Sequence, residues 1–130
     1  MIQAFGGLVF ILVSFSVNGA ACPSSPAIKA SECLSADIIK AEKSLNIAYK
    51  HLQTIAGTIN DPGSEGEAVA RALLAKAHKS WLNYRLSQCA FEAYQQGGVV
   101  NYKAVYNYQC LLEMSNQRIK LYEQFTKQQY

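Results

Sequence analysis

Apolar and polar residues follow a helical period in three long segments of this chain. In the first, from about residue 35 to residue 56, apolar side chains recur at alternating spacings of four and three, which places them on one stripe of a helix. Ser35 is positioned to cap the start of this helix, with Asp37 in its first turn, and Gly57 to end it. The stripe consists of Leu34, Ile38, Ala41, Leu45, Ala48, Leu52 and Ile55.

The second helical segment follows a turn signal, DPG, at residues 61–63. Ser64 and Glu67 have the three-residue separation of a capping box, so we expect the helix to begin there. The glycine pair at residues 97–98 should end it and let the chain reverse. The predicted core stripe consists of Ala70, Leu74, Ala77, Trp81, Tyr84 and Phe91.

The third segment runs from about residue 102 to residue 127, and its apolar stripe is broader and more aromatic than the other two. No proline interrupts the three segments, and no segment shows the two-residue period of a strand. Since short connections make consecutive helices antiparallel neighbours, the pattern predicts an all-α fold, an up-down-up three-helix bundle. The third stripe consists of Val105, Tyr108, Leu111, Leu112, Met114, Ile119, Leu121, Tyr122 and Phe125.

The first twenty residues have a different character. The run AFGGLVFILVSFSV, residues 4–17, contains no charge and is too short to cross a bilayer comfortably. The small residues Gly19, Ala20 and Ala21 follow it, as at a signal-peptidase site, although no Lys or Arg precedes the run. We therefore predict a cleaved signal peptide, residues 1–21, and a mature helical domain, residues 22–130; a retained membrane anchor is the alternative.

Four cysteines, an even number, all follow the leader and predict two disulfides that staple the bundle. Cys89 and Cys110 lie at similar heights on either side of the second turn, and Cys22 and Cys33 both precede the first predicted helix, so we favour these two pairs. Cross-pairing of the N-terminal segment onto the second or third helix remains open. Zinc ligands need closer pairs than these, so no metal site is expected.

The net charge and the residues just before Cys22 limit where the protein is located and which partners it binds. The mature domain carries the whole net charge of +3, with its basic residues scattered, which argues against a nucleic-acid partner. It has no further apolar stretch that could cross a membrane. We expect a periplasmic or secreted protein; a lipid anchor on Cys22 is less favoured, because Gly19 replaces the usual aliphatic residue three positions earlier.

No catalytic motif is present: neither GxSxG nor HExxH occurs, and all four cysteines are expected to be oxidised. We therefore expect no enzymatic activity and no cofactor. The densest cluster of chemistry-bearing residues is WLNYR, at residues 81–85, where an arginine beside aromatic rings could grip a carboxylate or a sugar.

A structural role for this cluster is favoured over a binding one. Trp81 and Tyr84 lie on the predicted core stripe, and Arg85 should lie at the height of Glu42 on the first helix, so an interhelical ion pair would orient the bundle. The same alternatives apply to three further residues beside the stripes, which could form a partly buried polar network: Asn46, Tyr49 and Arg118.

In order along the chain, the segments CPSSPAIKASEC, EKSLNIAY, LLAKAHKSWLNYRLSQC and CLLEMSNQRIKL, with a glycine pair before the last, resemble the LprI family of small exported bacterial proteins. Two positions depart from the family's pattern: Glu42 replaces the usual Asp, and His78 a frequent Gln. The positions that carry the resemblance are Cys22, Cys33, Glu42, Leu45, Asn46, Tyr49, Leu74, Trp81, Tyr84, Arg85, Cys89, Cys110, Arg118 and Leu121.

The resemblance implies an exported cell-envelope binding protein that inhibits a lysozyme or another peptidoglycan hydrolase. The alternative is a periplasmic structural or accessory interaction protein without inhibitory activity. A domain of charge +3 has no long-range attraction for cationic animal lysozymes, so an inhibitor needs a local acidic or loop-borne contact with the cleft. The exposed candidates for such a contact are the turn at 97–98 and the loop at 60–66.

Overall fold

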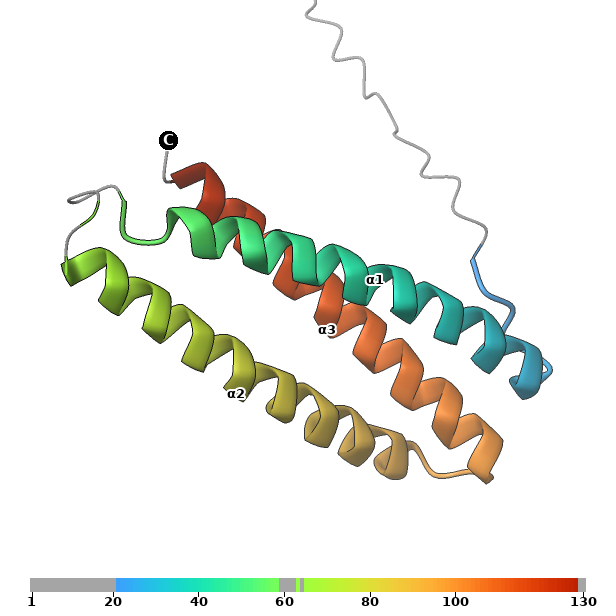
Figure 1. Cartoon of the computed structure of the whole chain (residues 1–130). Helices are drawn as coiled ribbons and strands as arrows, with labels where there is room; N and C mark the ends of the chain where they lie inside the picture. The colour runs from blue at the N-terminus through green and yellow to red at the C-terminus, as the bar shows by residue number, and fades with distance from the viewer. Residues whose placement is uncertain (1–20, 59–62, 64, 129–130) are drawn as a thin grey trace, which may run out of the picture.

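The computed structural model describes residues 21–58, 63 and 65–128, and these residues form three long helices. They are α1 (Ala27–Ile55), α2 (Glu65–Gln96) and α3 (Val100–Gln128). The helices run up, down and up, so that α1 and α3 point the same way and α2 points the other (Figure 1). The predicted all-α three-helix bundle is confirmed. The predicted signal peptide lies outside the described residues, apart from Ala21.

Helix α1 begins at Ala27, well before the predicted start at Ser35. Pro26 lies at the N-cap in an extended conformation, and its carbonyl accepts a hydrogen bond of 3.1 Å from the Ala30 amide. The added first turns bury their apolar side against the start of α3, which offsets the missing side-chain cap. Cys33 therefore lies inside the helix, and the expectation that it precedes the helix was wrong.

The connection between α1 and α2 is held by a close approach and by side-chain contacts. Gly57 has a φ of +78°, and a Cβ there would lie 2.8 Å from the Cα of Glu67, so this position requires glycine. Glu67 accepts a hydrogen bond from the Gly63 amide, and Arg71 donates one of 2.8 Å to the carbonyl of Thr54. Ser64, the predicted cap, lies outside the described residues.

Two clusters of buried side chains fill the interior, where α1 and α3 pack closely along their lengths. One lies where α1 and α3 begin, and the other joins all three helices. At about 25 cal/mol per Å² of buried apolar surface, such clusters supply most of the driving force for a small bundle. The first consists of Ala27, Ala30, Leu34 and Val105, and the second of Leu45, Leu52, Trp81 and Tyr122.

The buried side of α2 differs from the predicted stripe. Tyr84 and Phe91 are more than half exposed, Ala77 is exposed, and so is Phe125 on α3. Because α2 packs mainly against α3 and meets α1 at few points, only a narrow line of its residues is covered. That line steps by four and consists of Trp81, Arg85, Cys89 and Ala93.

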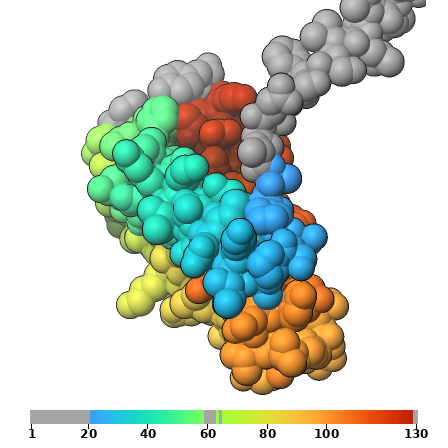
Figure 2. Space-filling view, turned by 90° about the vertical axis from the view of Figure 1, so that its right-hand side faces the viewer, coloured from blue at the N-terminus to red at the C-terminus, as the bar shows by residue number. Residues whose placement is uncertain are grey.

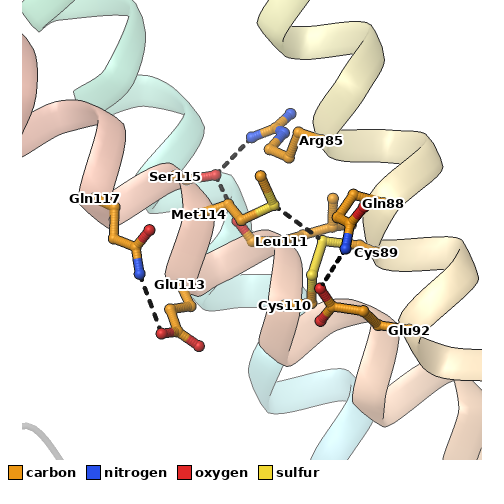
Figure 3. Close-up of a disulfide and its surroundings, with 10 residues drawn as sticks. All are labelled: Arg85, Gln88, Cys89, Glu92, Cys110, Leu111, Glu113, Met114, Ser115 and Gln117. Carbon is orange, nitrogen blue, oxygen red and sulfur yellow. Dashed lines mark hydrogen bonds between the residues drawn. A yellow bond between two sulfur atoms is a disulfide. The ribbon is translucent and has the colours of Figure 1, made fainter. Parts of the chain in front are cut away.

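Both favoured disulfides are confirmed. Cys22–Cys33 ties the segment before α1 back to its second turn, and Cys89–Cys110 joins α2 to α3, with Cα–Cα distances of 5.6 and 5.4 Å. Cys89 is fully buried, and the Met114 sulfur lies 3.6 Å from its Sγ (Figure 3). The hairpin of α2 and α3 is thus stapled from within the core.

Within the described part of the chain, none of the helices is long and apolar enough to cross a membrane.

Candidate functional site

The Arg85 guanidinium lies at the centre of a network that joins all three helices. Its Nη1 lies 2.5 Å from Oε1 of Glu42 on α1 and donates a hydrogen bond of 2.5 Å to the Ser115 hydroxyl on α3. Ser115 in turn donates to the Leu111 carbonyl at 2.6 Å (Figure 3). The predicted Glu42–Arg85 ion pair is confirmed. The Arg85 side chain is 7% exposed and that of Glu42 41%, so the pair reaches from the core to solvent.

The Trp81 indole carries two guanidinium groups against its ring. Arg85 lies 5.1 Å and Arg118 4.5 Å from the ring centroid, which is the geometry of cation–π attraction. Arg118 also lies 5.7 Å from the Tyr122 ring. Two cations on one ring system repel each other, and the Glu42 carboxylate on Arg85 offsets part of that repulsion.

Stacked aromatic rings extend the network toward the end of the bundle where α1 connects to α2. The Tyr49 and His78 rings are stacked, with centroids 3.9 Å apart and planes at 10°. The Tyr122 hydroxyl lies 2.8 Å from Nδ1 of His78 and belongs to the most deeply buried aromatic side chain of the bundle's described residues. Gln53 donates a hydrogen bond of 3.2 Å to the Tyr49 hydroxyl. The imidazole therefore links α1, α2 and α3 through its two aromatic neighbours.

Burial and charge set the protonation of this pair. Burial, together with the nearby Arg118 and Arg85 cations, lowers the pKa of His78 below its ordinary value of 6.5, although Glu42 opposes this. Burial raises the pKa of the Tyr122 phenol, and Arg118 opposes that shift. At neutral pH both groups are uncharged, which suits a half-buried hydrogen bond between them.

The stability of the bundle is therefore expected to fall as His78 takes up a proton. Because the pKa of His78 is lower in the folded chain than the unfolded value of 6.5, the unfolded chain binds the proton first as the pH falls. The free energy of unfolding should decrease from about pH 7 downward and level off below the folded pKa. Urea unfolding at a series of pH values measures this slope.

The matched variant for that measurement is His78→Gln, which keeps a hydrogen-bond partner for Tyr122 and removes the titration. The slopes of the free energy of unfolding against pH should differ most between the two proteins on the acid side of pH 6.5. Equal slopes for both proteins over the whole range would contradict the assignment of the titration to His78.

Sequence reasoning located most of this network but not all of it. Five of the predicted residues meet in it: Glu42, Tyr49, Trp81, Arg85 and Arg118. Asn46 and Tyr84 do not, because both lie on exposed sides of their helices.

Three residues of the network were not predicted as site residues. Their helical spacing from Trp81 and Arg118 would have indicated them if polar residues had been counted on the buried helix faces. His78 precedes Trp81 by three positions, and Ser115 and Tyr122 flank Arg118 by three and four. These are the spacings of one helix face. The missed residues are His78, Ser115 and Tyr122.

The interactions of this network hold the three helices together, and they form no arrangement of catalytic groups among the described residues. In the described residues the network contains one carboxylate, Glu42, and that carboxylate is engaged by Arg85. Next to this network, between α2 and α3, lies a hollow of about 160 Å³ lined by Trp81, Met114, Gln117, Arg118 and Leu121. A larger groove of about 590 Å³ lies between α1 and the end of α3, on another side of the bundle.

One group of side chains has the spacing of metal ligands. Donor atoms of Cys22, Cys33 and Asp37 lie within 4.8 Å of one another. Both sulfurs are joined in a disulfide, and a metal-binding cysteine must be a free thiolate, so this group does not fit a metal while the bond is intact.

Comparison with known proteins gives one family. A family model described as Lysozyme inhibitor LprI matches residues 20–121. Neither the search of curated proteins nor the search of solved structures gives a match. The matched range includes both disulfides and all of the network except Tyr122.

Proposed function

The chain belongs to the LprI family, and on that premise we propose that it is an exported envelope protein that binds a lysozyme or another peptidoglycan hydrolase and inhibits it. The observation that carries the proposal is the family match, which extends over residues 20–121 of the 130-residue chain. The leader-like residues 1–21 support export to the periplasm or the exterior, where such enzymes act.

The organisation of the bundle supports a binding role. Two disulfides and a network that joins three helices hold the backbone in one arrangement, so little conformational entropy is lost when a partner binds. A rigid scaffold of this kind inhibits an enzyme by occupying its cleft, and it needs no chemistry of its own.

Charge constrains how the complex forms. With a net charge of +3, the domain is repelled at long range by a cationic lysozyme, so electrostatic steering does not accelerate association. Affinity must then come from local contacts and slow dissociation. Added salt screens this repulsion, so the rate of association should rise modestly with salt, whereas that of a highly acidic inhibitor should fall.

The experiment is a titration of the purified, oxidised mature domain into a peptidoglycan turbidity assay. We expect a saturable loss of lytic activity against at least one class of lysozyme or bacterial hydrolase, complete by about tens of micromolar. The control is the same domain reduced and alkylated, which should lose its inhibition as it loses its staples. Undiminished lysis across several hydrolase classes at that concentration would contradict the proposal.

An accessory interaction protein of the envelope is the second candidate. Large apolar side chains on the first half of α2, Val69 and Leu73, are at least half exposed, as expected of a surface that meets another protein. Crosslinking in the native organism followed by mass spectrometry separates the candidates: recovery of hydrolases supports inhibition, and recovery of other envelope proteins alone supports the accessory role.

A further inference from the structure

Apolar and aromatic side chains gather at one end of the bundle, where α2 turns into α3. We call residues 91–106 the tip. Between the stapled Cys89 and Cys110, six large apolar side chains of the tip are exposed by 38 to 79%. They come from the end of α2, the turn and the start of α3: Phe91, Tyr94, Val99, Val100, Tyr102 and Tyr106.

The tip extends past the N-terminal end of α1. The first residues of α1, Ala27 and Ala30, pack at the level of Val105, so the turn and the adjoining helix ends lie beyond them. Figure 2 shows this end, in orange, projecting past the blue start of α1. The exposed apolar side chains are thus on a convex surface, which suits insertion into a concave partner.

A disulfide, a cation–π contact and backbone hydrogen bonds make the tip rigid. The Cys89–Cys110 disulfide closes its base, and Lys103 lies 4.6 Å from the centroid of the Tyr94 ring, which joins α3 to α2 across the turn. The Val99 carbonyl accepts hydrogen bonds from the amides of residues 102 and 103. Tyrosines on a rigid frame provide large contact area at small cost in conformational entropy.

Charge distinguishes the tip from the rest of the surface. Lys103 is the one charged residue between positions 93 and 109. Glu92, just before this stretch, accepts a hydrogen bond of 2.8 Å from Gln88, on the side away from the turn (Figure 3). Past Glu92, the turn and the start of α3 are therefore aromatic, with Lys103 as their single charge.

We propose that the tip is the surface that enters the glycan-binding cleft of the inhibited hydrolase, an inference that rests on the proposed function. Glycoside hydrolases of this type carry a pair of carboxyl groups in a cleft, and at least one of them is ionised. The tip holds one anion, Glu92 at its base, and one cation, Lys103; past Glu92 the turn and the start of α3 carry Lys103 alone, which complements that cleft even where the outer surface of the enzyme is cationic.

A second copy of the chain fits the tip less well. The tip projects as a convex surface, and two convex surfaces offer each other little contact area. A concave cleft can contact several sides of each inserted side chain.

The test compares tip variants with matched controls in the lysis assay. Tyr94→Ser and Val100→Ser alter the two most exposed apolar side chains of the tip, and Ile39→Ser and Leu86→Ser alter side chains that are more than half exposed on the bodies of α1 and α2. We expect each tip variant to weaken inhibition at least about tenfold and each control less than about twofold. Circular dichroism establishes that all four variants are folded.

A chito-oligosaccharide that occupies the cleft should also compete with the wild-type domain for the enzyme. Full inhibition by all four variants, or binding that the oligosaccharide leaves unchanged, would overturn the tip inference while leaving the inhibitor function intact. Loss of self-association or of binding to lipid vesicles in Tyr94→Ser, with inhibition unchanged, would assign the tip to a second copy or to a membrane surface instead. Absence of inhibition by the wild type would contradict the proposed function itself.

Discussion

Replacement of Trp81 by alanine should lower the free energy of unfolding by about 3–5 kcal/mol, the usual cost of removing a buried tryptophan side chain. Trp81 is 9% exposed and lies in the core cluster that joins the three helices. The variant also removes the ring on which Arg85 and Arg118 lie, so both cations lose a partner within the network. A small domain has only about 5–15 kcal/mol in total, so much of its stability depends on this residue.

Chemical unfolding followed by circular dichroism measures the effect, since Trp81 is the sole tryptophan and fluorescence is lost with it. Trp81→Phe keeps a ring and should cost less, which gives a measurable value if the alanine variant does not fold. Leu86→Ala, on the exposed side of the same helix, is the control and should change stability by less than about 0.5 kcal/mol. Equal losses for Trp81→Ala and Leu86→Ala would contradict the described core.

Removal of the Cys89–Cys110 disulfide, as Cys89→Ala with Cys110→Ala, should cost about 3 kcal/mol. The bond closes a loop with a sequence separation of 21, and breaking it gives the unfolded chain more conformations. The corresponding fall in melting temperature is roughly 10–20 °C for a domain of this size. Differential scanning calorimetry of the oxidised wild type and of the double variant measures it.

Cys22→Ala with Cys33→Ala is the matched comparison. That bond has a separation of 11 and ties the short segment before α1 to α1 itself. Its loss can free residues 21–26 without opening the bundle, so the fall in melting temperature should be clearly smaller. A larger effect from the Cys22–Cys33 pair would contradict the assignment of the hairpin staple as the main crosslink of the core.

The sequence predicts the number of helices, their directions and the cysteine pairs, because these depend on periodicity and on register along the helices. It predicts the start of α1 wrongly, because Ser35 resembles a cap whereas burial of Ala27 and Ala30 against α3 extends the helix upstream. Propensity is a local quantity, and in this case tertiary packing outweighs it.

The candidate site shows the same limit. Residues with charge or a large ring on a stripe, such as Arg85, were predictable from helix spacing. His78 and Tyr122 were not recognised as partners, because they are 44 positions apart and meet only when α2 and α3 pack. Tyr84 was misplaced because the angle of α2 against its neighbours decides which side is covered, and that angle is set by all contacts together.

The proposed binding of a hydrolase through the tip is tested most directly by hydrogen–deuterium exchange of the oxidised domain, with and without an excess of the hydrolase against which the lysis assay gives the strongest inhibition. We expect slower exchange in residues 91–106 on complex formation, greatest at the turn between α2 and α3, with the groove between α1 and α3 unchanged. Unchanged exchange throughout the domain, or protection confined to that groove, would contradict it.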